Sequence, residues 1–371
     1  MFPQITNIEQ VLPHFEGRAE FAIGKRDGYT FIDYNYILPD TFDDPIRLEG
    51  RGIKFCSKTG NILARPFHKF FNLGERADTQ FDTLPWHLPF VVQEKYDGSM
   101  IHPAIVDDRL VLMTRKGITD TAIQAMQECM TPELEESMRQ ELALGHTPMY
   151  EYVSPNNRIV IEYAKPALRF LAMRKTVTGV YSSYTHMFDG FMGGNMNPRA
   201  LVDTTRKTVG KEGVVICWPY TGQRVKLKAD EYVMLHRAID VLGSEKRILD
   251  VVLENKDDDL CAAISEDRAT KVREYAQSVR FSMRLIQQLV ESYVGAHSSI
   301  DQKTFAMGVL NTPMSTYSSE LFACRAGKLV GYEIGREFIR RHSRTQTDLE
   351  TNRLLLNLPK LQPLAFNNGD I

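Results

Sequence analysis

The spacing of apolar residues changes once along this 371-residue chain, and the change limits the folds open to it. Up to Lys228, aromatic and β-branched runs alternate with turn-forming residues, which is typical of strands. From about Glu231 onward, apolar residues recur every three or four positions, as one face of a helix requires. The clearest series is Val272, Tyr275, Val279, Met283, Ile286, Val290 and Tyr293. We therefore predict an α+β domain over residues 1–243 and an all-helical C-terminal domain over residues 244–371.

Local patterns predict individual elements. Two apolar runs, 100–106 and 110–114, flank the turn formers Asp107 and Asp108, which indicates a hairpin. We expect Lys95 and Lys116 to lie near opposite ends of that strand pair. The stretch 121–144 contains no Gly and favours a helix. Further strands are expected at 149–153, 159–163, 214–218 and 224–227, and further helices at 304–310, 318–326 and 329–342.

Composition restricts the class of protein more than it identifies it. The hydrophobic fraction of 43% and charged fraction of 25% are those of a globular chain that buries a core. A net charge of -2 excludes a uniformly basic nucleic-acid coat, so any nucleic-acid contact must come from local basic patches. Without an N-terminal signal or a long apolar run, we expect a cytoplasmic protein with no membrane contact. The scattered cysteines form no zinc or redox spacing: Cys56, Cys129, Cys217, Cys261 and Cys324.

Lys95 is the first candidate for chemistry. It follows the apolar run 90–92 and begins the string Lys95-Tyr96-Asp97-Gly98. A lysine amine is a nucleophile only after it loses its extra proton, which burial or nearby cations favour. The glycine lets a nucleotide approach the backbone closely. The alternative is an ordinary exposed turn, since so short a string also occurs on protein surfaces.

Further charged residues stand in strand-like runs where packing alone would favour apolar side chains. Glu151 lies within the run 149–153, and Glu212 precedes the run 213–216. Lys226 and Lys228 alternate with Leu227, so both lysines point to one face of a strand. Two like charges on one face repel unless an anion lies between them, and an α-phosphate is a suitable anion. The alternative is a solvated edge face.

A basic and aromatic segment precedes these residues. Arg51-Gly52 and the run 65–72 offer cations for phosphate and aromatic rings for a base. Phe70 and Phe71 are equally ordinary core residues by type. The segment therefore extends the candidate nucleotide site without deciding which ring contacts a ligand.

Taken in order, these strings resemble the motifs of covalent nucleotidyltransferases, which include DNA ligases, RNA ligases and mRNA capping enzymes: Lys95-x-Asp97-Gly98, Glu151-Tyr152-Val153, Glu212-Gly213 and Lys226-x-Lys228. Finer strings are similar to the phage RNA ligase 1 family of the tRNA-repair type: Tyr34-Asn35-Tyr36, Arg51-Gly52-Ile53, Lys69-Phe70-Phe71-Asn72, residues 151–160, and 226–230 followed by Tyr232. The resemblance covers nearly the whole chain, although past about residue 265 it lies in helical character.

The resemblance implies a nucleotidyltransferase domain (ATP-grasp-like) with antiparallel sheets, and it implies roles at matched positions. Lys95 would carry AMP. The implied catalytic set is Lys95, Lys116, Glu151, Glu212, Lys226, Lys228 and Tyr232. The implied ATP-binding set is Tyr34, Arg51, Lys69, Phe71, Asp97, Gly98, Glu151, Gly213, Lys226 and Lys228. The implied metal ligands are Glu212 and Asp258, although three aspartates at 257–259 are also a usual helix start.

The activity implied is that of an ATP-dependent RNA ligase with Mg²⁺, which joins 5′-phosphate and 3′-hydroxyl RNA ends through lysyl-AMP and an adenylated 5′ end. The resemblance further implies RNA or tRNA repair, a substrate such as a tRNA anticodon loop selected by the helical domain, a monomer, and the host cytoplasm for a phage protein. Two alternatives are a DNA ligase or capping-type enzyme, which usually carries an OB-fold after the lysine pair, and an inactive RNA-binding relative. No five-strand pattern follows Lys228, and the retention of Lys95, Glu212 and both later lysines argues against inactivity.

Overall fold

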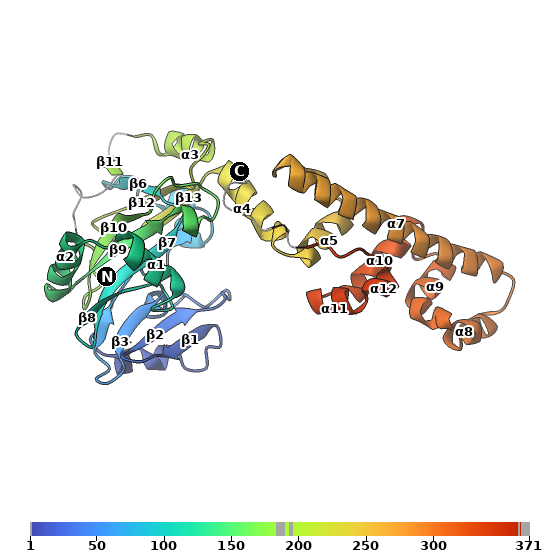
Figure 1. Cartoon of the computed structure of the whole chain (residues 1–371), viewed down its shortest axis with the longest axis horizontal. Coiled ribbons are helices and arrows are strands. Elements are labelled where there is room, and N and C mark those ends of the chain that lie inside the picture. The colour runs from blue at the N-terminus through green and yellow to red at the C-terminus, as the bar shows by residue number, and fades with distance from the viewer. Residues whose placement is uncertain (1, 183–189, 193–195, 363, 365–371) are drawn as a thin grey trace. The chain divides into compact units, whose positions relative to one another are not determined.

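The computed structural model describes residues 2–182, 190–192, 196–362 and 364, and it divides the chain into two compact units. The first unit covers residues 1–233 and the second covers residues 234–371. Figure 1 shows strands and helices in the first unit, and every regular element described in the second is a helix. The division falls inside helix α4 (Asp230–Leu242), and the predicted boundary at residue 243 lies just past the end of that helix.

Three sheets form the first unit. One has the order β1 (Phe21–Lys25), β2 (Tyr29–Tyr34), β3 (Ile53–Cys56), β4 (Ile62–Ala64). A second has the order β10 (Ala167–Lys175), β9 (His146–Val153), β7 (Ser99–Val106), β8 (Arg109–Met113). The third has the order β11 (Gly190–Met192), β6 (Val91–Lys95), β12 (Gly213–Cys217), β13 (Arg224–Lys228), β5 (Phe71–Asn72). The pairs are antiparallel except β5 with β13, so the predicted α+β class with antiparallel sheets is confirmed.

The predicted hairpin is present as β7 and β8, with Asp107 and Asp108 both at positive φ in its two-residue turn. The expectation that Lys95 and Lys116 lie at opposite ends of this pair is wrong. In an antiparallel hairpin the first strand begins where the second ends, and His102 pairs with Met113. Residues just before β7 and just after β8 are therefore neighbours, and both lysines line one cavity.

Two other predicted elements differ in the structure. The single helix expected over 121–144 is two helices, α1 (Asp120–Cys129) and α2 (Pro132–Ala143), because Pro132 lacks an amide hydrogen and begins a new helix after the N-cap Thr131. The strand expected over 159–163 is absent, since the backbone amides of Val160 and Ile161 instead donate to the Asp97 carboxylate at 2.7 Å each.

Helices cover the sheets of the first unit. The apolar faces of α1 and α2 pack on the second sheet in a core that includes Ile101, Leu112 and Tyr150. Helix α3 (Pro198–Arg206) packs Leu201 and Val202 on the outer face of the third sheet. The inner faces of the second and third sheets are thereby left to line the site described below.

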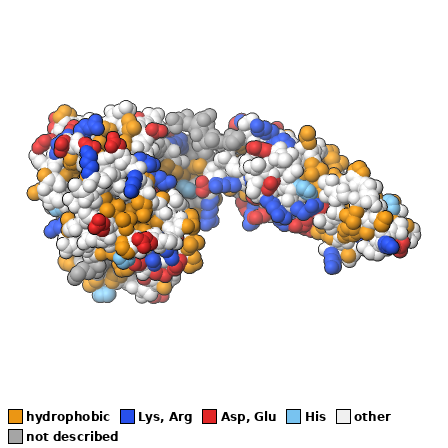
Figure 2. Space-filling view, turned by 90° about the horizontal axis from the view of Figure 1, so that it is seen from below, with side chains coloured by type: hydrophobic (Ala, Val, Ile, Leu, Met, Phe, Trp, Pro, Cys, Tyr) orange, Lys and Arg blue, Asp and Glu red, His pale blue; other side chains and the backbone are white. Residues whose placement is uncertain are grey.

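The second unit is built around α7 (Glu266–Ala296), and the predicted apolar series forms the buried face of this helix. From Val272 to Val290 the series is buried, and Tyr293 packs partly buried against the same core. The other helices are α5 (Glu245–Leu253), α6 (Asp257–Ala262), α8 (Gln302–Leu310), α9 (Ser318–Arg325), α10 (Tyr332–His342), α11 (Gln346–Thr351) and α12 (Arg353–Leu356). None of the described helices has the length and apolar character needed to span a bilayer. On the face shown in Figure 2, basic and acidic side chains are interspersed.

Candidate active site

A cavity of about 540 Å³ lies between the second and third sheets. Its floor comes from β6, β12 and β13, and its other walls come from β7, β9, β10 and the loops around residues 51, 67–70 and 114–121. The residues that line it are Asp33, Arg51, Phe67, Phe70, Gln93, Glu94, Lys95, Tyr96, Gly98, Ser99, Met100, Thr114, Arg115, Lys116, Thr119, Thr121, Glu151, Leu171, Val215, Arg224, Lys226 and Lys228.

Strand register brings three of the predicted motifs into one row of the floor. Gly213 at the start of β12 pairs with Lys95 on one side and with Lys228 on the other. Glu212, just before this glycine, is buried and accepts both amines: Lys95 Nζ lies 2.6 Å from Oε2 and Lys228 Nζ lies 3.0 Å from Oε1. A carboxylate of the protein therefore lies between Lys95 and Lys228, while the anion predicted between Lys226 and Lys228 stays a prediction.

Lys226 belongs to the next row of the floor, and its amine lies among other cations. It pairs in register with Val215, which pairs with Gln93. Leu227 and Val225 turn the other way into a core, so Lys226 and Lys228 share the cavity face as predicted. Burial lowers the pKa of Lys226 to about 7, and the nearby cations Arg51, Lys69 and Lys95 add to the effect. An anion in the cavity would relieve this repulsion.

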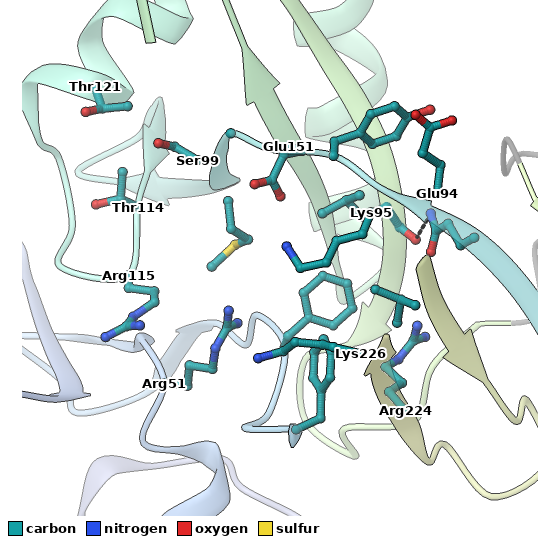
Figure 3. Close-up of a pocket in the computed structure, with 18 of the residues that line it drawn as sticks. Arg51, Glu94, Lys95, Ser99, Thr114, Arg115, Thr121, Glu151, Arg224 and Lys226 are labelled. Atoms are coloured by element: carbon teal, nitrogen blue, oxygen red, sulfur yellow. Dashed lines mark hydrogen bonds between the residues drawn. The ribbon is translucent and has the colours of Figure 1, made fainter. Parts of the chain in front are cut away.

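Glu151, on β9, faces the floor from the second sheet. Burial raises the pKa of its carboxyl to about 7, with Glu212 and Asp97 adding to the rise while Lys95 and Arg51 oppose it. Figure 3 shows the nitrogen atoms of Arg51, Lys95 and Lys226 pointing into a common space, with the Glu151 carboxylate beside it. The site thus combines several cations with one carboxyl group that is poised between its two protonation states near neutral pH.

Arg51 lines the opposite wall of the cavity. The predicted residue Tyr34 does not line the cavity, and its hydroxyl is held by Arg115, which the sequence did not single out, and by the predicted Lys69. Arg115 holds the Asp33 carboxylate through Nε and Nη2, at 3.0 and 2.9 Å, and its Nη1 donates to the Tyr34 hydroxyl at 3.2 Å. Lys69 Nζ donates to the same hydroxyl at 3.4 Å. Burial opposes ionisation of Tyr34, but Arg115, Lys69 and Arg51 outweigh it and lower the pKa of the phenol. Arg51 Nη1 is buried and, within the described residues, has no hydrogen-bond partner.

Lys54 fixes the turn that carries Arg115 and Lys116 to the cavity rim. Its fully buried amine donates to the carbonyl oxygens of Gly52, Thr114 and Arg115 at 2.5, 3.1 and 2.9 Å. The three acceptors match the three N–H groups of an ammonium. Burial nevertheless lowers the pKa of Lys54 to about 7. The exposed Lys116 follows directly on this anchored segment and lines the cavity.

Asp97 and Tyr232, both predicted site residues, form a support beneath the Lys95 turn. The Tyr232 hydroxyl donates to Asp97 Oδ1 at 2.6 Å, while Oδ2 accepts the amides of Val160 and Ile161. Burial raises the pKa of Tyr232, and Glu212 and Asp97 raise it further, so the phenol keeps its proton. Asp97 is buried and fully engaged by these donors, and it is not part of the cavity lining.

The two predicted glycines serve close contacts between strands. A Cβ on Gly98 would lie 2.2 Å from the carbonyl oxygen of Tyr152 in β9, so the turn after Lys95 packs directly on that strand. Gly213 has φ +139, and a Cβ there would lie 2.1 Å from the carbonyl oxygen of Leu227. Gly98 also lines the cavity, whereas the close neighbour that explains Gly213 is β13.

The run 65–72 divides its residues among different tasks. Phe67 and Phe70 line the cavity, and Lys226 Nζ lies 5.0 Å from the centre of the Phe70 ring. Phe71, predicted to bind ATP, does not line the cavity; it is buried in the core beneath β1–β4, with Lys69 Nζ 5.1 Å from its ring centre. Arg65 is buried against Glu49, which Arg174 also holds.

Asp258 lies in the first turn of α6 in the second unit, and its neighbour Asp257 is paired with Arg280 at 2.7 Å. Within the part of the chain that the structure describes, no group of three or more His, Cys, Asp or Glu side chains is placed to hold a metal ion. The role of Asp258 as a metal ligand therefore stays a prediction.

Sequence reasoning missed Arg115, Lys54, Gln93 and Arg224. The first two act through contacts with distant segments, which no local pattern reveals. The last two had a signal, because Gln93 alternates with Lys95 along β6, and Arg224 alternates with Lys226 and Lys228 along β13. Extending the alternation that singled out the lysine pair would have found both residues.

Comparison with known proteins identifies the family. The family model described as RNA ligase matches residues 49–193. A protein of Thermovibrio ammonificans named "Putative RNA ligase" is 32% identical over 274 residues, which covers 70% of this chain and 72% of that protein. The chain belongs to the RNA ligase family. Within this RNA ligase family, RNA ligase 1 of bacteriophage TS2126 is 28% identical over 185 residues, or 47% of each chain.

Among solved structures the likeness of this RNA ligase family member is weak. An archaeal ATP-dependent RNA ligase, form 1, overlaps 93% of this chain and 94% of that chain with a TM-score of 0.47 and 14% identity. The matched segment of the family model, 49–193, contains Arg51, Lys95, Lys116 and Glu151, while Glu212 and the lysines of β13 lie beyond it.

Proposed function

We propose that this enzyme is an ATP-dependent RNA ligase in which Lys95 becomes covalently attached to AMP. One observation carries the proposal: Lys95 lies in a cavity where Arg51, Lys95 and Lys226 converge and where Phe67 and Phe70 supply aromatic wall. A nucleotide needs both, cations for its phosphates and aromatic surface for its flat base. Family membership and the names of the relatives support RNA as the molecule that is joined.

The cations fit a triphosphate. Phosphoanhydride cleavage concentrates charge on non-bridging oxygens and on pyrophosphate, so fixed positive groups aimed at these atoms lower the barrier. Arg51 Nη1 lacks a partner within the described residues, and Lys226 is held among like charges that lower the pKa of its amine to about 7. Both features are unfavourable without a bound anion, and phosphate oxygens would satisfy them.

In the first step, the neutral amine of Lys95 attacks the α-phosphorus of ATP, a P–N bond forms, and the P–O bond to pyrophosphate breaks. The lysine must lose a proton, and the Glu212 carboxylate at 2.6 Å is placed to accept it. In the second step, AMP passes from Lys95 to the 5′-phosphate of an RNA. In the third, an RNA 3′-hydroxyl displaces AMP and forms the phosphodiester bond.

A divalent cation fits the carboxyl groups of the site. Burial and the neighbouring carboxylates Glu212 and Asp97 raise the pKa of Glu151 to about 7, so the cations Lys95 and Arg51 only partly offset the cost of ionising Glu151. Glu151 and Glu212 are hard oxygen donors, the ligands that Mg²⁺ prefers together with phosphate. When bound, Mg²⁺ would neutralise charge on the phosphates. Asp258 is proposed as a further ligand from the family resemblance alone.

The proposal extends to the substrate and setting. RNA ends with a 5′-phosphate and a 3′-hydroxyl supply the two groups that the second and third steps need. We further propose that residues 244–371 select the RNA, with a tRNA anticodon loop as the candidate substrate, and that the enzyme acts as a monomer in the cytoplasm, that of the host if a phage encodes it. A phage relative supports this setting.

Incubation with α-labelled ATP and Mg²⁺, then with a 5′-phosphorylated single-stranded RNA, tests the function. We expect one AMP on Lys95, found by mass spectrometry of peptides, and circular or joined RNA after the second incubation. A chain that binds ATP without acquiring AMP would be a non-catalytic relative. Joining of a nicked DNA duplex in preference to RNA would favour the DNA ligase alternative.

A further inference from the structure

The cavity contains two buried polar side chains that the proposed chemistry does not use. Gln93 lies on β6 two residues before Lys95, and Arg224 lies on β13 two residues before Lys226, so all four share the cavity face. In Figure 3, Arg224 lies beyond Lys226 on the side away from Arg51. Arg224 therefore lies away from Arg51, while Gln93 lies in the row of Val215 and Lys226.

Gln93 offers a free hydrogen-bond acceptor. It is 4% exposed, and its Nε2 donates to the backbone carbonyl of Leu171 at 3.0 Å. Because a carbonyl oxygen can only accept, this bond fixes which way the amide faces. Among the described residues Oε1 has no donor, so a group that enters the cavity with an N–H can bind there.

Arg224 offers donors without a counter-charge. It is 8% exposed, and no carboxylate forms an ion pair with it within the described residues. Its Nη1 contacts the Cys217 sulfur at 2.7 Å, and its Nε is buried without a partner. Burial raises the pKa of the Cys217 thiol, so the sulfur stays neutral and does not offset the guanidinium. Burial of such a group is costly unless a ligand completes its hydrogen bonds.

The surroundings of these two residues suit a flat ring. The Phe67 ring lines the cavity, and its centre lies 5.2 Å from the Arg224 guanidinium carbon. The Tyr181 ring, whose centre lies 4.1 Å from the same carbon, is outside the cavity lining and packs against Arg224. Val215 pairs in register with Gln93 and also lines the cavity. Apolar and aromatic walls with a few fixed polar groups are the usual composition of a site that reads a base.

We propose that Gln93 and Arg224 recognise the edge of the nucleotide base, with Gln93 accepting from the exocyclic amine of adenine and Arg224 donating to one of its ring nitrogens. The proposal rests on the proposed function and deepens it by making these residues the determinants of base specificity. Guanine carries a carbonyl oxygen where adenine carries the amine. That oxygen would face Oε1 of Gln93, acceptor against acceptor, so the pair selects adenine over guanine.

The first experiment measures single-turnover labelling of Lys95 by nucleotides labelled at the α-phosphate. Wild type is given ATP, GTP and purine riboside triphosphate, which lacks the amine. We expect labelling with the latter two to be slower than with ATP by about tenfold or more. In Gln93→Ala, the rate of labelling by ATP should fall to the rate of labelling by purine riboside triphosphate, because the exocyclic amine has lost its acceptor. Gln4→Ala, an exposed change in the same unit, is the matched control.

The second experiment concerns Arg224. Arg224→Met should slow labelling by ATP by about tenfold or more. Of 1-deaza-, 3-deaza- and 7-deaza-ATP, the analogue that lacks the contacted nitrogen should be slow with wild type and no slower than ATP with the variant. Arg206→Met, on the exposed face of α3, controls for loss of an arginine. If Arg224→Met does not fold, Arg224→Lys can be used instead, because lysine keeps the charge but lacks the planar guanidinium with its several donors. The series of analogues with wild type does not depend on any variant.

The outcomes separate the two proposals. Equal labelling of wild type by ATP and purine riboside triphosphate would overturn the role of Gln93. Parallel losses for all three deaza analogues in wild type and Arg224→Met would make Arg224 a structural residue between the cavity and Cys217. If ATP leaves wild type unlabelled, the proposed function itself fails, and the base assignment fails with it.

Discussion

The amine of Lys95 lies 2.6 Å from the carboxylate of Glu212, and strand register brings the two residues close together. Glu212 directly precedes Gly213, whose backbone pairs with Lys95 and Lys228 at once. The carboxylate therefore lies just before the start of β12, between two amines. The pairing positions the nucleophile before any ligand binds and gives the lysine an adjacent acceptor for its proton.

Lys95→Ala should abolish covalent attachment of AMP while changing the free energy of unfolding by less than about 1 kcal/mol. The lysine side chain is partly exposed, and Glu212 keeps its contact with Lys228 in the variant. Intact mass after incubation with ATP and thermal unfolding measure the two effects. Lys211→Ala, which removes an exposed lysine paired with Glu94, should still acquire AMP. An AMP adduct on Lys95→Ala would contradict the assignment.

Lys226→Met should slow the attachment of AMP but stabilise the folded protein. Burial lowers the pKa of Lys226 to about 7, and Arg51, Lys69 and Lys95 add to this. Between about pH 7 and the unfolded pKa of about 10.4, the unfolded chain binds more protons than the folded chain, so stability rises with pH. Below about pH 7 the lysine is charged in both states, and the full cost of burying that charge lowers the stability of the folded state.

The ligand-free variant should therefore be more stable than wild type at pH 6.5, by about 2 kcal/mol, and this advantage should shrink toward pH 10. Labelling by ATP should slow by about 100-fold or more, because one cation aimed at the phosphates is lost. Melting temperatures at the two pH values and single-turnover rates test both parts. Destabilisation at pH 6.5 with normal labelling would make Lys226 a structural residue.

Glu151→Gln should remove a pH dependence of the opposite sign. The folded-state pKa of about 7 lies above the unfolded value of about 4.3, so the folded chain binds more protons between these values. Stability of the ligand-free wild type should then be highest below the unfolded pKa and fall as pH rises toward 7. The glutamine variant should lack this fall and exceed wild type at pH 8 by about 2 kcal/mol. Parallel stability curves for the two proteins between pH 5 and 8 would show that Glu151 does not titrate as described.

Much of the site could be predicted from alternation along single strands. Because side chains of a strand alternate between faces, Lys226 and Lys228 had to share one face, and the structure places both at the cavity. The same rule, applied two residues further back, leads to Arg224. What alternation cannot give is the partner strand, so the shared contact of Glu212 with Lys95 and Lys228 appears only in the sheet register.

The errors have equally specific causes. Lys95 and Lys116 were separated because the direction of the hairpin was not followed through, although antiparallel strands return to their starting end. A continuous helix over 121–144 is ruled out by Pro132, which begins a second helix. Arg115 was missed because its place depends on Asp33, 82 residues away in the chain, and local sequence contains no trace of that contact.

Removal of the residues after 243 should leave some AMP attachment but impair the choice among RNA substrates. The described residues of the cavity all belong to the first unit, which has several apolar cores of its own. Cutting at 243 keeps Tyr232 and all of α4, but it uncovers Ala238 and Leu242, which are buried in the core of the second unit. We therefore expect a less soluble protein whose Lys95 chemistry survives in part.

Asp258 provides the competing explanation for any loss, since the shortened protein also lacks this proposed metal ligand. Full-length Asp258→Asn separates the two: if it labels Lys95 normally, a loss in the shortened protein does not come from the metal. Residues 1–243, the full chain and Asp258→Asn should be compared for AMP attachment and for joining of a nicked tRNA anticodon loop against a generic single strand. We expect the full chain and Asp258→Asn to share one preference between the two RNAs, and the shortened protein to lose it. An unchanged preference after truncation would mean that the catalytic unit selects the RNA by itself.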